Sequence, residues 1–272
     1  MQTLWKLSLF TLRAFLFGAC LCASTVSAGA QWITYPTSGI PRTSDGKPDL
    51  TAPTHRTSDG KPDLSGIWAP VAPPNAPTFN TVGPNLTDYM PAGAVIPMQP
   101  SAQALFNKRS ASLGAGRPTE QCLPHGIPDA MLPPTPFKIV QIPGLTLLLY
   151  EEFNHFRQIF TDGRPLPPAT QPAWLGYSVG KWEGDTFVVD TSGFNDQSWL
   201  DDWGRPHTEA MHTIERFRRS DFGHMEMEVT IDDPKAYTKP WSATVRFTLL
   251  PDTELIENIC DNERDHARIV GK

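Results

Sequence analysis

Short segments in which apolar and polar residues alternate dominate the chain from Phe137 onward. In HMEMEVTI, residues 224–231, every second residue is apolar and the residues between are charged or polar, and WSATVRFTL at 241–249 repeats this alternation. A period of two places successive side chains on opposite faces of a strand. The pattern therefore predicts strands with one face buried and the other in water.

Turn residues such as PG at 143–144 and EGD at 183–185 divide this half of the chain into short segments. We predict strands at 64–68, 137–142, 145–152, 155–161, 175–182, 186–192, 211–219, 224–231, 241–249 and 254–260. About nine or ten antiparallel strands joined by short turns predict an all-β, lipocalin-like barrel, with a two-sheet sandwich as the alternative.

The region 31–136 has a different texture, dense in Pro, Gly, Ser, Thr and Ala. Proline removes backbone donors and fixes φ, so this region is a poor central sheet and a poor helix, apart from a short helix predicted at 101–113. We predict an irregular arm at 31–136, including the strand at 64–68, that wraps a barrel core at 137–272. A short C-terminal helix is predicted at 261–272.

The sequence RTSDGKPDL occurs twice, at 42–50 and 56–64. Solenoid repeats need units of about 20 residues or more, so this shorter unit is not a repeat fold. We interpret it as a duplicated lead-in to the first strand, in which an Asp-Gly bend is followed by an extended Lys-Pro pair. A calcium site at the repeated aspartates is the alternative, but D-x-D-x-D-G spacing is absent.

The first 30 residues have the pattern of an export signal. Lys6 and Arg13 precede the apolar run at 14–23, and small residues allow cleavage after Ala28 or Ala30. The apolar run is shorter than the roughly 20 residues that span a bilayer, so we predict cleavage and a periplasmic or secreted protein with no integral membrane segment. Lipoprotein anchoring through Cys20 is the alternative.

Removing this signal leaves 21 basic and 29 acidic residues, a formal charge of −8. Such a chain lacks the positive surface that nucleic acid requires. Cleavage also leaves Cys122 and Cys260 as the remaining cysteines. In an oxidising compartment two cysteines without competitors predict one disulfide, which would tie the arm to the last predicted strand.

Two motifs resemble known families. LSGIW at 64–68 resembles the G-x-W signature that opens lipocalin-like barrels. The block YEEFNHFRQIFTDGRPLP at 150–167, followed by WLGYSVGKWEGDTFVVDTSGF at 174–194, is similar to a large family of exported bacterial proteins whose members also carry DGKPDLSGIW. The resemblance implies a barrel but no particular reaction.

One candidate reactive group surrounds the strand predicted to begin at His155. Arg157 and Ile159 share a face with His155, and a tight turn would bring Glu151 and Glu152 close to the imidazole. A carboxylate beside an imidazole can orient a general base, and a nearby guanidinium can stabilise developing negative charge. We therefore predict His155, Glu151 and Arg157 as catalytic candidates, with a charged surface cluster at a hairpin as the alternative.

Glu215 is the fourth catalytic candidate. It alternates with Phe217 on one face of the strand at 211–219, so it is predicted to point inward, where burial would raise its pKa. The alternative is that Glu215 pairs with Arg157 or Arg246 in the barrel wall.

A polar and aromatic set near the predicted mouth completes the site. Loop tryptophans at a barrel mouth suit an apolar or ring-shaped ligand, although core packing is an equal explanation for several of them. The predicted ligand-binding residues are Tyr177, Trp182, Trp199, Trp203, His207 and Glu209.

Several kinds of chemistry have no motif here. The chain lacks H-E-x-x-H, G-x-S-x-G and G-x-G-x-x-G, so we predict no metal and no cofactor, while haem stays open. We predict an exported small-molecule-binding barrel, and in its enzymatic interpretation a cofactor-free isomerase, lyase or cyclase. The alternative is a non-catalytic envelope module that binds carbohydrate or a protein.

Overall fold

The structure, a computed structural model, describes residues 36–74, 82–168 and 171–260. The predicted signal at 1–30 and the predicted helix at 261–272 lie outside this range. In the described residues no helix is both long and apolar enough to cross a membrane. The strands are β1 (Gly66–Pro70), β2 (Phe137–Ile142), β3 (Leu145–Tyr150), β4 (Phe156–Phe160), β5 (Tyr177–Glu183), β6 (Thr186–Ser192), β7 (His212–Arg219), β8 (His224–Asp232) and β9 (Trp241–Leu249).

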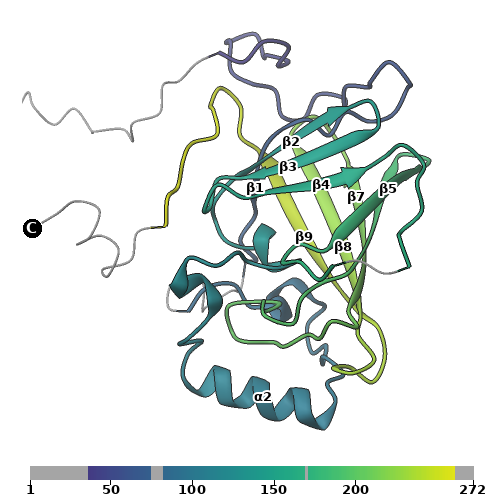
Figure 1. The fold of residues 1–272 in the computed structure, drawn as a ribbon. Coiled ribbons are helices and arrows are strands. Elements are labelled where there is room, and N and C mark those ends of the chain that lie inside the picture. The colour runs from purple at the N-terminus through teal and green to yellow at the C-terminus, as the bar shows by residue number, and fades with distance from the viewer. Residues whose placement is uncertain (1–35, 75–81, 169–170, 261–272) are drawn as a thin grey trace, which may run out of the picture. The chain divides into compact units, whose positions relative to one another are not determined.

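These strands of the described chain form a closed nine-stranded barrel in sequence order, which confirms the predicted fold (Figure 1). β1 closes the barrel by pairing with both neighbours, with Gly66 opposite Ile139 on β2 and Trp68 opposite Leu249 on β9. Every pair is antiparallel except β4 and β5. Residues 161–176 supply the long connection that a parallel pair requires.

Most strand predictions are confirmed to within a few residues, and β2, β6 and β9 begin and end as predicted. The strand predicted at 254–260 is wrong, because this segment makes one isolated bridge, from Asn258 to Glu152. The reason is the closure of the barrel. β9 already pairs with β8 on one side and β1 on the other, so no edge is left for another strand.

The barrel interior is filled by alternate side chains of its strands. The described interior carries large buried groups from most strands, including Phe137, Ile159, Phe187, Val189, Phe217, Met225, Met227, Val229, Val245 and Phe247. Trp68 is fully buried, donates its indole N–H to the Leu64 carbonyl at 2.9 Å, and lies 4.9 Å from the Arg219 guanidinium. This packing occupies the space in which the sequence predicted a ligand.

The arm covers both ends of the barrel. We call the end at Phe137, Tyr150, Ser192 and Trp241 the mouth. Figure 1 shows α2 (Pro100–Ala111) below this end and the earliest described residues at the opposite end. The mouth is also lined by loop 193–211 and by the short 3-10 helices η1 (Leu86–Tyr89), η2 (Pro118–Gln121) and η3 (Asp129–Met131).

The duplicated sequence forms the same loop twice. In each copy a threonine amide donates to a lysine carbonyl four residues later at 2.9 Å, in the pairs Thr43 to Lys47 and Thr57 to Lys61. The arginine of each copy then pairs with a different aspartate, Arg42 with Asp252 just after β9 and Arg56 with Asp185 in the turn between β5 and β6. The repeat is therefore a pair of clasps that attach the arm to the barrel.

The predicted disulfide is confirmed. Cys122 and Cys260 are bonded with a Cα–Cα distance of 5.5 Å and a separation of 138 residues. The bond ties the arm at η2 to the segment that follows β9.

Candidate functional site

Arg157 and Glu215 both lie inside the barrel and bind each other, and the inward position of Glu215 is the one that the alternation predicted. Arg157 Nη1 lies 2.9 Å from Glu215 Oε1 and Nη2 lies 2.5 Å from Oε2, with exposed fractions of 2% and 0% for the two residues. Arg157 also donates to Ser178 at 3.0 Å and to Thr191 at 2.8 Å. Burial alone would lower the pKa of Arg157, but Glu215 raises it on balance. The pairing alternative for Glu215 is thus the one observed, and both charges are occupied.

His155 and Glu151 do not form the predicted acid/base pair. His155 precedes β4 and is half-buried, with Nδ1 3.5 Å from the Glu152 carbonyl oxygen. The Glu151 carboxylate instead accepts the Ile256 amide at 3.2 Å. The turn places Phe153 at φ 56° and thereby separates these side chains. Burial raises the pKa of Glu151, but no imidazole nitrogen reaches it among the described contacts.

The predicted mouth-loop residues are mostly packed. Trp199 is buried with the Arg109 guanidinium 4.4 Å from its ring, and the Trp203 indole donates to the Gly83 carbonyl at 3.3 Å. His207 is buried, and its Nε2 lies 2.7 Å from Ser198 Oγ. Glu209 is exposed. A sugar-stacking platform at Trp199 and Trp203 is therefore not presented to solvent as a pair.

Tyr177 and Trp182 lie on β5 and pack against neighbouring rings. The Tyr177 ring stacks on Phe160 with centroids 5.2 Å apart and its hydroxyl accepts from Arg164 at 3.1 Å. Trp182 packs against Phe187, also at 5.2 Å. Both side chains are half-buried, and these contacts account for them without a ligand.

The structure brings together a different group, centred on His125 at the mouth. His125 and Asp129 are four residues apart, and the intervening segment enters η3 so that the two side chains meet. His125 Nδ1 lies 2.6 Å from Asp129 Oδ2, and Nε2 lies 3.0 Å from Glu152 Oε2, contributed by the turn between β3 and β4. A buried imidazole is therefore held between two carboxylates.

Asp202 adds a third carboxylate from loop 193–211. Its Oδ1 accepts from Arg117 Nη1 at 3.0 Å, and Arg117 also donates to the Val82 carbonyl. Gly83 lies against Asp202 so closely that a Cβ built there would stand 1.9 Å from Oδ2. The glycine is thus required for this carboxylate to occupy its place.

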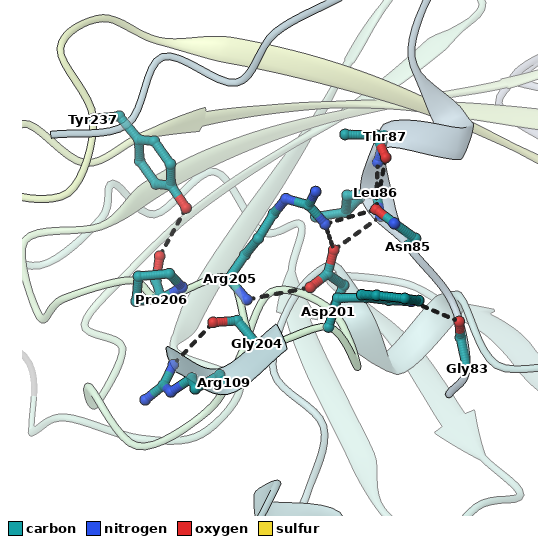
Figure 2. A network of polar contacts seen from close by, with 11 residues as sticks. Gly83, Asn85, Leu86, Thr87, Arg109, Asp201, Gly204, Arg205, Pro206 and Tyr237 are labelled. Atoms are coloured by element: carbon teal, nitrogen blue, oxygen red, sulfur yellow. Dashed lines mark hydrogen bonds and ion pairs between the residues drawn. The ribbon is translucent and has the colours of Figure 1, made fainter. Parts of the chain in front are cut away.

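A polar network fixes the loop that carries Asp202 (Figure 2). The neighbouring Asp201 pairs with Arg205 and accepts the Leu86 amide at 2.9 Å, while Arg205 also donates to Asn85 at 2.7 Å. Tyr237 donates its hydroxyl hydrogen to the Pro206 carbonyl at 2.7 Å. These contacts tie the loop to η1 and to the segment between β8 and β9, so the position of Asp202 is determined by well-packed neighbours.

We call the group His125, Asp129, Glu152 and Asp202 the mouth cluster. A hollow of about 480 Å³ lies beside it. Its wall combines three members of the cluster with other polar side chains and with apolar surface. The lining residues are Gly83, Pro84, Arg117, Thr119, Glu120, His125, Pro133, Pro134, Glu152, Phe153 and Asp202. We call this space the mouth hollow.

Burial and mutual charge perturb the mouth cluster. Burial raises the pKa of Asp129 to about 7, although His125 opposes the shift. Burial likewise raises the pKa of Asp202 against the effects of His125 and Arg117. For His125, burial would lower the pKa, but Asp129 and Glu152 together raise it well above its usual value. Perturbed groups gathered beside a hollow are characteristic of functional sites.

The cluster also has donor atoms for a cation. His125, Asp129 and Asp202 each offer one ligand atom, and these atoms lie within 4.8 Å of one another. No sequence pattern predicted this group. The four-residue spacing of His125 and Asp129 was a weak signal, but nothing in the sequence indicated that Asp202 and Glu152 would join them.

The chain matches no family model, no curated protein and no solved structure. Function is therefore argued from the site alone. The resemblance to exported bacterial proteins stays a prediction.

Proposed function

We propose that this protein is an exported barrel that binds a small organic molecule in the mouth hollow and acts on it by acid/base chemistry. The observation that carries the proposal is the hollow of about 480 Å³ with His125, Glu152 and Asp202 in its wall. This volume lies within the range of small-molecule sites, which place a few polar groups in a mainly apolar wall. The proposal moves the ligand from the barrel interior to the mouth.

The wall gives the ligand its chemical class. Pro133, Pro134 and Phe153 supply apolar surface, and Arg117 supplies a positive charge that it shares between Asp202 and Glu120. We expect a compact molecule with one apolar face and at least one polar or anionic group. This differs from the purely apolar or ring-shaped ligand that the aromatic residues predicted.

Glu152 is the member of the cluster best placed to exchange a proton with the ligand. Its side chain is 20% exposed and lines the hollow, while the His125 side chain is 6% exposed and lies between Glu152 and Asp129. A carboxylate in hydrogen-bond contact with an imidazole is a unit that general acid/base catalysis uses. In this proposal Glu152 replaces Glu151 and Glu215, and His125 replaces His155.

The cellular location is part of the proposal. A disulfide between Cys122 and Cys260 fits an oxidising compartment, and the segment 1–30 has the pattern of an export signal. N-terminal sequencing of the protein from cell envelope fractions would test the location. A mature N-terminus near Gly29 or Gln31 is expected, and an intact Met1 in the cytoplasm would contradict it.

The binding site can be located by NMR. The mature protein is screened against a library of small organic acids, phenols and sugars, and amide shifts are mapped for each binder. We expect shifts around Thr119, Glu152 and Phe153. Shifts confined to interior strand residues, or to Tyr177 and Trp182, would overturn the proposed location.

Glu152→Gln tests the proposed chemistry on any library compound that the protein converts. Because the amide keeps the size of the side chain but cannot take up a proton, we expect turnover to fall by about 10²-fold or more, with a smaller effect on binding. Glu209→Gln is the matched control, since Glu209 is exposed in the mouth loop. Full turnover by Glu152→Gln, or an equal loss in Glu209→Gln, would remove the catalytic role.

A further inference from the structure

We propose that His125, Asp129 and Asp202 bind one divalent transition-metal ion in the wall of the mouth hollow. The ion would lie beside the bound ligand, so the inference extends the proposed function. It rests on that function for the position of the ligand. Zinc and manganese are the ions that this mixture of one imidazole and two carboxylates suits.

The first observation is the geometry of the donor atoms. One atom from each of the three side chains lies within 4.8 Å of the other two, and all three residues are buried. Three protein ligands leave coordination positions free for water or a ligand, which is the arrangement of catalytic metal sites. His125 and Asp202 line the hollow, so those positions would face it.

The second observation is independent of spacing. Asp129 is 3% exposed, and its Oδ1 has no hydrogen-bond partner among the described residues. A buried carboxylate oxygen without a partner is costly and calls for an unseen ion or water. A metal ion shared with His125 and Asp202 would supply that partner.

The third observation concerns the far side of the imidazole. Nδ1 of His125 faces Asp129, while Nε2 lies 3.0 Å from Glu152. Histidines that bind metals through one nitrogen usually donate the other N–H to a carboxylate, which fixes the ring and its tautomer. Glu152 has the position of that orienting carboxylate.

Charge balance favours the same conclusion. Asp129, Asp202 and Glu152 bring three carboxylates close to His125, and Arg117, which pairs with Asp202, is shared with Glu120. Arg117 engages Oδ1 of Asp202, while Oδ2 of the same carboxylate lies against Gly83. A divalent ion would take over from a protonated His125 the balancing of this negative charge, with the imidazole then neutral and free to act as a ligand.

The test uses the mature protein without a histidine tag, stripped by a chelator. Zn²⁺, Mn²⁺, Ca²⁺ and Mg²⁺ are titrated separately by calorimetry, and the products are weighed by native mass spectrometry. We expect one Zn²⁺ or Mn²⁺ ion per chain, with Ca²⁺ and Mg²⁺ bound more weakly. Asp129→Asn and Asp202→Asn should each weaken binding by more than tenfold, and Glu152→Gln by about 10- to 100-fold.

Asp190→Asn is the matched control, because Asp190 pairs with His212 on the barrel surface, where an ion could bind adventitiously. Near-ultraviolet circular dichroism of each variant confirms its fold, and the mild Glu152→Gln change keeps the test informative if Asp129→Asn does not fold. No stoichiometric ion in wild-type protein, or equal losses in Asp190→Asn, would overturn the inference.

The two proposals fail separately. If a small molecule still binds the hollow in fully stripped protein and no ion is taken up afterwards, the metal site is overturned and the proposed function stands. If the cluster binds an ion but the NMR shifts lie away from the hollow, the metal site stands and the proposed function is overturned.

Discussion

Charged side chains inside this protein form two different kinds of group, one fully paired and one not. Arg157 and Glu215 satisfy each other deep in the barrel, whereas the mouth cluster keeps a buried carboxylate oxygen that has no partner among the described residues. The first arrangement is complete and rigid. The second is incomplete and lies beside open space, which is where chemistry is expected.

Glu215→Gln should destabilise the fold strongly. Removing one partner of a buried ion pair leaves the other charge uncompensated, at a cost of about 3–5 kcal/mol. Urea unfolding followed by circular dichroism measures this loss. Glu183→Gln breaks the exposed pair with Arg216 and should change little. An equal response of the two variants would show that the interior pair has no special weight.

Gly83→Ala should lower the affinity of the cluster for its metal ion. The added Cβ would collide with Asp202 Oδ2, and the residue has φ +116°. Gly93→Ala is the control, because Gly93 also has positive φ but open space around it. Backbone strain of about 1 kcal/mol is expected for both variants, and a loss of ion affinity for Gly83→Ala alone. Equal affinity in the two variants would contradict the role of Gly83.

Sequence alternation correctly placed Glu215 inside and put Arg157 on the same face as Ile159, because period two is a property of the strand itself. It could not place His125 or Asp202. Both lie in irregular segments whose path depends on tertiary packing, and Asp202 is positioned by Asp201, which binds Arg205 and η1. His155 was misplaced in relation to Glu151 because one turn conformation decided which side chains met.

At the scale of elements, the segment after β9 connects the fold to the site. Asn258 bridges Glu152, its carbonyl accepts the Phe153 amide at 2.9 Å, and Cys260 is bonded to Cys122. The turn that carries Glu152 is therefore held from outside the barrel. Such a contact between a turn and a distant segment has no periodic signature in the sequence. The residues 254–260 were therefore predicted to form a strand, although they hold the turn instead.

Replacing both Cys122 and Cys260 by serine should cost about 4–5 kcal/mol of stability, since the disulfide closes a loop of 138 residues. The same change should lower ion affinity by freeing the segment that contacts Glu152. Thermal denaturation and calorimetry measure the two effects. Unchanged ion affinity in the folded double variant would show that this segment does not support the cluster.

At the scale of the whole molecule, the barrel determines where function can lie. Its described interior is packed, and loops collect at the mouth, with the clasped repeats at the other end. The sequence predicted this architecture well because strands and turns are local. Whether a barrel is hollow depends on how its side chains interlock, which is not a local property of the sequence, so the place of a ligand stays a prediction.

Acid should destabilise the molecule partly through His207. Burial lowers the pKa of His207 in the fold, although Asp233 and Asp196 raise it and Arg109 adds to the lowering. The unfolded chain then binds the proton more readily, so stability falls as pH drops below about 6.5 and the loss is complete below the folded pKa. Urea midpoints at pH 7 and 5 should differ less in His207→Gln than in wild type. His224→Gln, at the exposed first residue of β8, should behave like wild type.

The number of strands in the described barrel has a consequence of its own. In a closed barrel with an odd number of strands, the strand direction cannot alternate all the way round. At least one pair of neighbours among the nine must therefore be parallel. That seam joins β4 to β5 through the short register of Ile159 with Ser178 and Phe160 with Val179. Arg157 bonds across it to Ser178. Arg157, which Glu215 holds in place, thus ties the two parallel strands together from the barrel interior, and amide exchange in β4 and β5 should report any loosening of this contact.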